Sequence, residues 1–95
     1  MFLVVLRQAG PAWNPSVPLE EQSGWEEHAA FMDALVEMGF IVLGGPLVEG
    51  RVAHAIEADS EEEIRGVLAR DPWSDTHLVV ERIEPWTIRL DGRAR

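Results

Sequence analysis

Three histidines, at positions 28, 54 and 77, are the side chains of this sequence best suited to proton transfer near neutral pH. His28 lies in the segment GWEEHAAFMDALVEMGF, whose apolar residues recur at the spacing of an amphipathic helix. On a helical wheel His28 falls inside the apolar stripe, between Met32 and Leu35. An inward-facing histidine can also be a hydrogen-bonded structural residue, so the helix alone gives His28 no function.

A carboxylate partner for His28 is available at Asp71, in the motif RDPW that follows a second predicted helix. One further turn along the inward face of that helix, beyond Ile64 and Leu68, leads to Asp71. A carboxylate fixes the tautomer and orientation of an imidazole, and a His–Asp pair can then act as a general acid or base. Asp71 can equally be part of a helix stop, because the residue before a proline disfavours helical geometry.

Five further residues are candidates for binding a substrate. Glycine backbone can approach a ligand closely and present N–H groups to it, and tryptophans can form the walls of an aromatic pocket. The candidates are Gly44, Gly45 and Pro46 in LGGPL, together with Trp73 and Trp13. The simpler interpretation is that Gly-Gly-Pro is the end of a strand and that Trp73 belongs to the core.

The remaining histidines rank lower as functional candidates. His54 alternates with Val52 and Ile56 on a predicted strand, which indicates packing on a sheet face or interface, away from His28. His77 opens the last predicted strand and is a minor candidate for the pocket rim. The three histidines lack the spacing of metal ligands and the chain has no Cys, so we expect no metal site and no cofactor.

The elements that must position these residues follow the order strand, helix, strand, strand, helix, strand. Apolar segments rich in β-branched residues predict strands over 2–7, 40–47, 51–58 and 77–86, and 87–95 predicts a short final strand with a frayed end. Amphipathic segments predict helices over 20–38 and 60–70. Ser23 with Glu26, and Ser60 with Glu63, have the spacing of capping boxes at the two helix starts.

This order predicts an α+β, ferredoxin-like βαββαβ fold, with a four-stranded antiparallel sheet and both helices on one face. The third strand should lie between the first and second, and the fourth on the other side of the first. In that topology the start of the first helix, the end of the second strand and the end of the second helix share one end of the sheet. His28, residues 44–46 and residues 71–73 are therefore expected to converge.

The strand segments FLVVL and FIVL are apolar at every position, which indicates that both faces of the sheet are buried. The helices cover only one face, so we expect a homodimer, packed sheet face to sheet face as a dimeric α+β barrel. The alternative is a monomer whose C-terminal tail folds across the sheet.

Composition limits the partners. With 95 residues the chain is one domain, 1–95, and its formal net charge of −9 argues against nucleic acid and against an anionic membrane surface. No segment is long and apolar enough to span a membrane, and MFLVVL is too short for a signal peptide. The predicted partners are a second copy of the chain and an unidentified small molecule, and the predicted location is the cytoplasm.

Across nearly the whole chain, from the first strand to EPW, the sequence resembles the YCII-related (YciI-like) family of dimeric α+β-barrel proteins. The motifs that carry the resemblance are EEHAAFMDAL, LGGPL and RDPW. The resemblance implies that His28 and Asp71 are the active-site pair. It also matches Gly45, Pro46 and Trp73 to the family's Gly-Pro and aromatic positions. Because most members have no assigned reaction, it indicates a fold and a site rather than a substrate.

Two hypotheses for function follow. In the first, the protein is a cofactor-independent lyase or isomerase, in which His28 moves a proton on a small cyclic or aromatic substrate and Asp71 orients His28. In the second, it is a non-catalytic small-molecule-binding or interaction module, in which the His28–Asp71 pair is a polar clasp between the helices. A cofactor-free oxygenase is a third possibility that no feature of the sequence favours.

Overall fold

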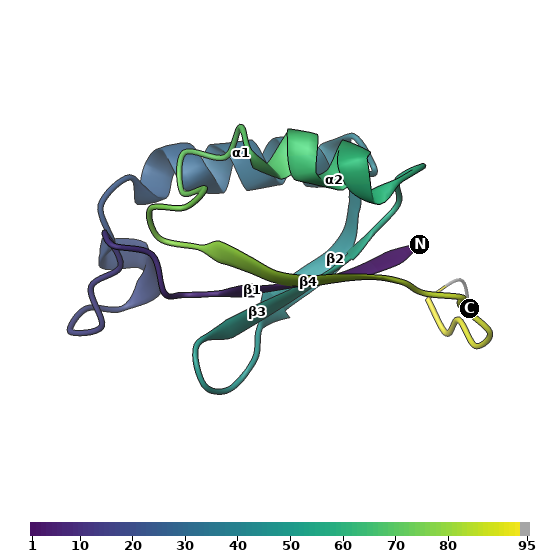
Figure 1. Cartoon of the computed structure of the whole chain (residues 1–95), viewed down its shortest axis with the longest axis horizontal. Helices are drawn as coiled ribbons and strands as arrows, with labels where there is room; N and C mark the ends of the chain where they lie inside the picture. The colour runs from purple at the N-terminus through teal and green to yellow at the C-terminus, as the bar shows by residue number, and fades with distance from the viewer. Residues whose placement is uncertain (94–95) are drawn as a thin grey trace.

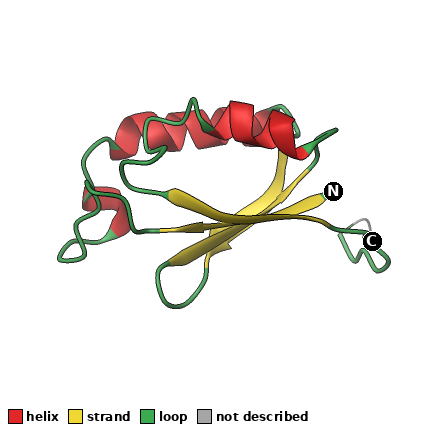
Figure 2. Cartoon of the chain, viewed as in Figure 1, coloured by secondary structure: helices red, strands yellow, loops and turns green. Residues whose placement is uncertain are grey.

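The computed structural model describes residues 1–93 and has two layers, a sheet and a pair of helices lying over one of its faces (Figures 1 and 2). The strands are β1 (Phe2–Arg7), β2 (Ile41–Pro46), β3 (Arg51–Ile56) and β4 (Val79–Pro85). The helices are α1 (Trp25–Glu37) and α2 (Glu61–Leu68), and a short 3-10 helix, η1 (Leu19–Glu21), precedes α1.

The sheet order is β2-β3-β1-β4, and all three neighbouring pairs are antiparallel. The predicted α+β, ferredoxin-like arrangement is therefore confirmed, including the insertion of β3 between β1 and β2. Both connections that contain a helix return over the same face, so α1 and α2 both lie above that face of the sheet (Figure 1).

The core lies between the sheet and the two helices. Val4 in β1 and Ile56 in β3 have no exposed surface, and neither does Ile64 in α2. Because side chains alternate along a strand, Val4 shares its face with its cross-strand partner His54. This register turns His54 toward the helix layer, where the core is.

The two helix starts differ. At α2 the Ser60 hydroxyl accepts a hydrogen bond from the Glu63 N–H at 3.1 Å, as predicted. At α1 the predicted Ser23 cap is wrong, because the N-cap is Gly24 in the left-handed region (φ 73°), with no side-chain cap. Glycine adopts this conformation without steric cost, and it lets the chain turn sharply into α1. Ser23 is thereby left outside the helix, and its hydroxyl instead lies 2.9 Å from His77 Nε2.

The chain after β4 forms no strand over 87–93, so the predicted short final strand is wrong there, and residues 94 and 95 lie outside the described part. The described tail, 87–93, leaves the sheet at the end of β4 and pairs with neither of the two edge strands, β2 and β4 (Figure 1). Among residues 1–93, no helix combines the length and the apolar character that crossing a bilayer requires.

Candidate active site

His28 and Asp71 lie in direct contact, although they are 43 positions apart in sequence. His28 Nδ1 is 2.9 Å from one Asp71 carboxylate oxygen and 3.0 Å from the other. Each residue is only 7% exposed. An ionised carboxylate can only accept hydrogen bonds, so Nδ1 of His28 carries the proton and donates it. The other ring nitrogen, Nε2, then remains available to a ligand.

The carboxylate of Asp71 is held in place by the turn that ends α2. Pro72 cannot continue the helix, and the chain turns so that the Trp73 N–H donates to Asp71 Oδ1 at 2.9 Å. This is an Asx turn, in which an aspartate side chain binds the backbone two residues on. The sequence Asp-Pro-Trp thus both ends the helix and fixes the orientation of the carboxylate toward His28.

Trp73 forms the platform beneath this pair. Its ring is parallel to that of His28, with centroids 4.0 Å apart and an angle of 7° between the planes. His77 stacks on Trp73 as well, at 4.6 Å and 15°. The indole Nε1 donates to the Ser23 carbonyl at 2.8 Å, which ties the turn to the segment before α1. Trp73 is 1% exposed, so it sets the ring plane of His28 from within the core.

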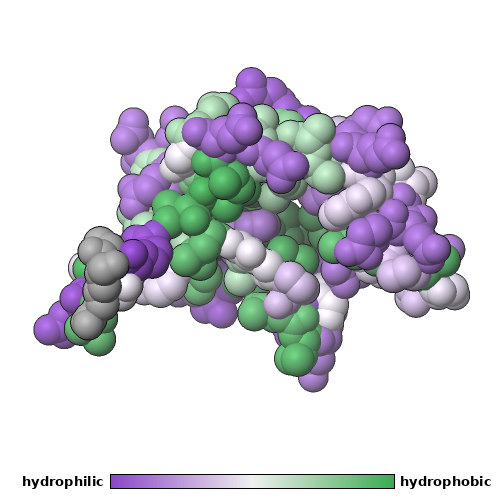
Figure 3. Space-filling model, turned by 180° about the vertical axis from the view of Figure 1, so that it is seen from behind, coloured by the Kyte–Doolittle hydropathy of each residue, from purple (hydrophilic) through white to green (hydrophobic). Residues whose placement is uncertain are grey.

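A cavity of about 180 Å³ opens beside His28, between α1 and the β2–β3 side of the sheet. Figure 3 shows the molecule from behind, where the surface is hollowed between the helix layer and the sheet. An apolar cavity of about 150 Å³ is enough to hold benzene, so this one accommodates a single small ring. It is lined by Gln8, Leu19, Trp25, His28, Met32, Gly44, Gly45, Pro46, Val52, His54, Trp73 and Leu78.

Most of the predicted binding residues meet at this cavity. Gly44, Gly45, Pro46 and Trp73 all line it together with His28. Trp13 does not, because it packs edge-on against Trp73 at 6.2 Å and 86°, where it supports the platform from outside.

His77 also lies outside this cavity. It occupies the face of Trp73 that His28 does not use, and Thr76 Oγ1 is 2.9 Å from its Nδ1. Burial, followed by the nearby His28, lowers the pKa of His77. With Ser23 on its other nitrogen, His77 has partners on both sides of its ring, which suits a structural residue.

The prediction that His54 lies away from His28 is wrong. His54 lines the cavity together with His28, directly opposite Gly44 in the β2–β3 pair. A Cβ atom added at Gly44 would overlap Nδ1 of His54, so glycine is what allows the imidazole to lie against β2. The signal was present in the sequence: an antiparallel hairpin between two predicted strands brings Gly44 and His54 opposite each other.

Burial lowers the pKa of His54 to about 4, with a further lowering by His28 that is partly offset by Asp71. His54 is therefore a neutral imidazole at pH 7, within the electrostatic influence of the His28–Asp71 pair. Its Nδ1 is fully buried and has no hydrogen-bonding partner within residues 1–93. Trp25, whose ring centroid is 5.8 Å from that of Trp73, is a further aromatic lining residue that was not predicted from the sequence.

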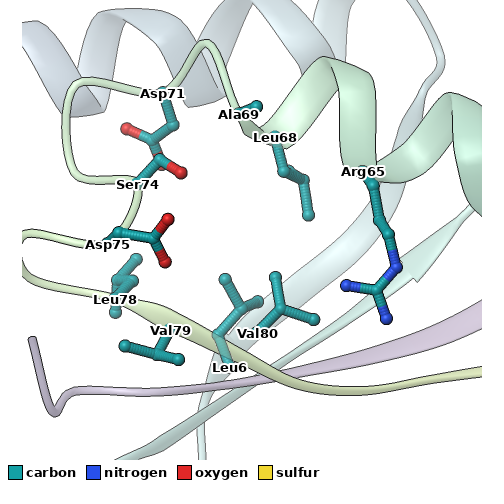
Figure 4. A pocket seen from close by; sticks show the side chains of 10 residues that line it. All are labelled: Leu6, Arg65, Leu68, Ala69, Asp71, Ser74, Asp75, Leu78, Val79 and Val80. Atoms are coloured by element: carbon teal, nitrogen blue, oxygen red, sulfur yellow. The ribbon is translucent and has the colours of Figure 1, made fainter.

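A second cavity, of about 210 Å³, lies between α2 and β4 and is shown in Figure 4. Leu68 points into it from the helix layer, and Leu6 and Val80 point into it from the sheet (Figure 4). Its cation, Arg65, is held by Glu61 at 2.8 Å. Asp71 is one of its lining residues, but none of them is a histidine. This cavity therefore lacks a side chain suited to proton transfer near neutral pH.

Within residues 1–93, no group of three or more His, Cys, Asp or Glu side chains is arranged to hold a metal ion. Comparison of the sequence with protein-family models found no match, and comparison with curated proteins found none either.

Proposed function

We propose that this chain is a YciI-like, cofactor-independent enzyme of the lyase or isomerase type, which acts on a small cyclic or aromatic substrate. The observation that carries the proposal is the buried contact between His28 and Asp71 at the wall of a cavity the size of one small ring. A histidine oriented by a carboxylate and facing an apolar cavity is a common general acid–base arrangement.

In this mechanism Asp71 holds Nδ1 of His28 in its protonated form, and Nε2 exchanges the proton with the substrate. Stacking on Trp73 keeps the imidazole in one plane, so that Nε2 keeps a fixed direction toward the cavity. The backbone of residues 44–46 borders the same cavity and would lie beside a substrate oxygen.

The alternative is a binding module in which His28–Asp71 joins α1 to the turn after α2 and no reaction occurs. The same buried contact supports this alternative, since a hydrogen-bonded pair at two helix ends also stabilises the fold. Two variants separate the two functions. His28→Asn keeps an N–H donor near the position of Nδ1 but lacks Nε2, whereas His28→Ala lacks both.

We expect His28→Ala to lose about 2–4 kcal/mol of stability, because a buried carboxylate loses its partner. His28→Asn should retain most of that stability and lose turnover of any substrate found by screening. Urea unfolding measures the stability, and an assay of the reaction found by screening measures the turnover. A His28→Asn protein that turns over substrate at the wild-type rate would exclude the acid–base role.

We also propose that the chain forms a homodimer through the outer face of the sheet. Leu3, Leu43 and Ala53 alternate with the core-facing residues and so belong to the face away from the helices. Leu43 is 53% exposed, and Val48 at the end of the adjoining hairpin is 81% exposed. Exposed apolar side chains gathered on one face are typical of an interface. The placement of this homodimer in the cytoplasm rests on the sequence alone.

The test of the homodimer is the molar mass in solution, measured by light scattering during size-exclusion chromatography. The wild type should have the mass of two chains, and Leu43→Arg should shift it toward one. Val36→Arg is the matched control, because Val36 is also 53% exposed but lies on α1. A monomeric wild type, or equal effects of the two substitutions, would contradict a sheet-face dimer.

A further inference from the structure

His54 is a buried polar side chain that the proposed His28–Asp71 chemistry leaves unused. It is 8% exposed, and its Nδ1 is fully buried without a hydrogen-bonding partner among residues 1–93. A buried polar group without a partner is destabilising, and in native proteins it needs an explanation. His54 lines the same cavity as His28, so a ligand held there can contact the other ring nitrogen, Nε2.

The surroundings of Nδ1 decide which nitrogen of His54 carries the proton. Nδ1 is enclosed against the Gly44 backbone, close to the position where the Cα hydrogen points. An N–H there would be a buried donor facing a C–H group, whereas a lone pair there faces a weak C–H donor. The favoured neutral tautomer therefore has its proton on Nε2, and Nε2–H is a hydrogen-bond donor for the cavity.

The two histidines of the cavity thus differ in what they offer a ligand. His28 donates from Nδ1 to Asp71, which leaves the lone pair of Nε2 as a base. His54 remains uncharged, because burial lowers its pKa to about 4, and it offers an N–H. A neutral imidazole that donates to a carbonyl oxygen while a neighbouring base removes a proton is a known way to form an enolate.

We propose that His54 donates a hydrogen bond from Nε2 to the carbonyl oxygen of a small cyclic ketone or enone bound in the cavity. This inference rests on the proposed function and names its substrate class. His28 Nε2 takes a proton from the carbon next to the carbonyl, and the C–H electron pair becomes a C=C bond. The carbonyl π electrons move to the oxygen, which His54 stabilises. For an enone whose C=C begins one carbon beyond, the His28 imidazolium then returns the proton to the far end of that C=C. The electron pair on the oxygen re-forms the C=O bond and the C=C moves next to the carbonyl, which completes an isomerisation without any co-reactant. A saturated ketone regains the proton at the same carbon and only exchanges it.

The experiment uses two probes of nearly the same shape. Cyclohexanone carries the acceptor oxygen, and methylenecyclohexane has a CH₂ group in its place. Affinities are measured by NMR titration for the wild type, His54→Leu, His54→Gln and His28→Asn. Leu removes the donor without leaving an unpaired polar group, so the variant is expected to fold, and Gln supplies another N–H donor.

We expect His54→Leu to weaken cyclohexanone binding about fivefold relative to methylenecyclohexane, the factor that one net hydrogen bond contributes. His54→Gln should recover part of that ratio, and His28→Asn should leave it unchanged. An unchanged ratio in His54→Leu would overturn the inference, and so would a wild type that binds neither probe. Long-range ¹H–¹⁵N spectra give an independent result: a proton on Nδ1 of His54 would also overturn it.

A separate measurement keeps this inference distinct from the proposed function. In D₂O, removal of the proton next to the carbonyl appears as deuterium incorporation into cyclohexanone. If the wild type binds cyclohexanone through His54 but catalyses no exchange, the acid–base function fails and the binding role of His54 stands. If exchange depends on His28 but not on His54, the function stands and the role of His54 is excluded.

Discussion

The buried, neutral His54 makes the stability of this protein depend on pH in a way that a single substitution should remove. The pKa of His54 is lowered from 6.5 to about 4 in the folded chain. Between these values the unfolded chain binds a proton that the folded chain does not, so stability falls as the pH falls below 6.5. Above pH 6.5 His54 is neutral in both states and contributes no pH dependence.

The size of the effect follows from the two pKa values. At about 1.4 kcal/mol for each pH unit, the full difference between 6.5 and about 4 amounts to about 3 kcal/mol. About 2 kcal/mol of this is already lost at pH 5, where the unfolded histidine is almost fully protonated. For a chain of this size, 2 kcal/mol is a large part of the total stability.

Urea unfolding of the wild type and His54→Leu at pH 8.5, 7.5 and 5.0 measures this contribution, because other titrating groups act on both proteins and cancel in the comparison. The wild type should lose about 2 kcal/mol more than His54→Leu between pH 7.5 and 5.0. Between pH 8.5 and 7.5 the two should change equally. Equal losses down to pH 5.0 would refute the argument that His54 is buried in its neutral form.

Two further predictions concern the neighbours of the histidines. Gly44→Ala should destabilise the fold by about 1–3 kcal/mol, because its Cβ would overlap the His54 ring, whereas Gly45→Ala, with no atom within 4 Å of the added Cβ, should be nearly neutral in urea unfolding. Asp71→Asn should keep the volume of the side chain but lower deuterium exchange by about a hundredfold or more, because an amide no longer enforces the Nδ1–H tautomer of His28. The first argument would be contradicted by a loss of stability in Gly45→Ala as large as that in Gly44→Ala. The second would be contradicted by an Asp71→Asn protein with full exchange activity.

The elements that could be predicted from the sequence are those fixed by local chemistry. Apolar segments rich in β-branched residues mark β1 and β3, and the Ser60 cap with its acidic first turn marks α2. The start of α1 could not be predicted in this way, because Ser23 is engaged by residues about fifty positions later. Its hydroxyl meets His77, and its carbonyl accepts from Trp73. A capping box is a local pattern, and such distant partners override it without leaving a trace in the nearby sequence.

The residues of the candidate site likewise divide into those that the sequence predicts and those that it does not. His28 and Asp71 were predictable because the topology brings a helix start and a helix end to one end of the sheet. His54 was misplaced because alternation along a strand shows which residues share a face but not which face the helices cover. The pairing of β2 with β3 supplies the missing information, since it sets His54 against Gly44 on the helix side. The sequence could not show that Trp13 lies outside the cavity, because its edge-on contact with Trp73 depends on the path of the loop that carries Trp13.

The two candidate functions require different histidines, and they differ in whether they give His54 a role. A polar clasp between α1 and the turn after α2 needs only His28 and Asp71, both of which have their partners within the chain. It gives no reason for a second buried imidazole whose Nδ1 finds no hydrogen-bonding partner in the described part of the chain, an arrangement that destabilises the fold by about 1–3 kcal/mol. Leucine at position 54 would fill the space without that penalty. A ligand-binding role for the cavity gives both histidines a function, because His54 then donates from Nε2 to the ligand on which His28 acts.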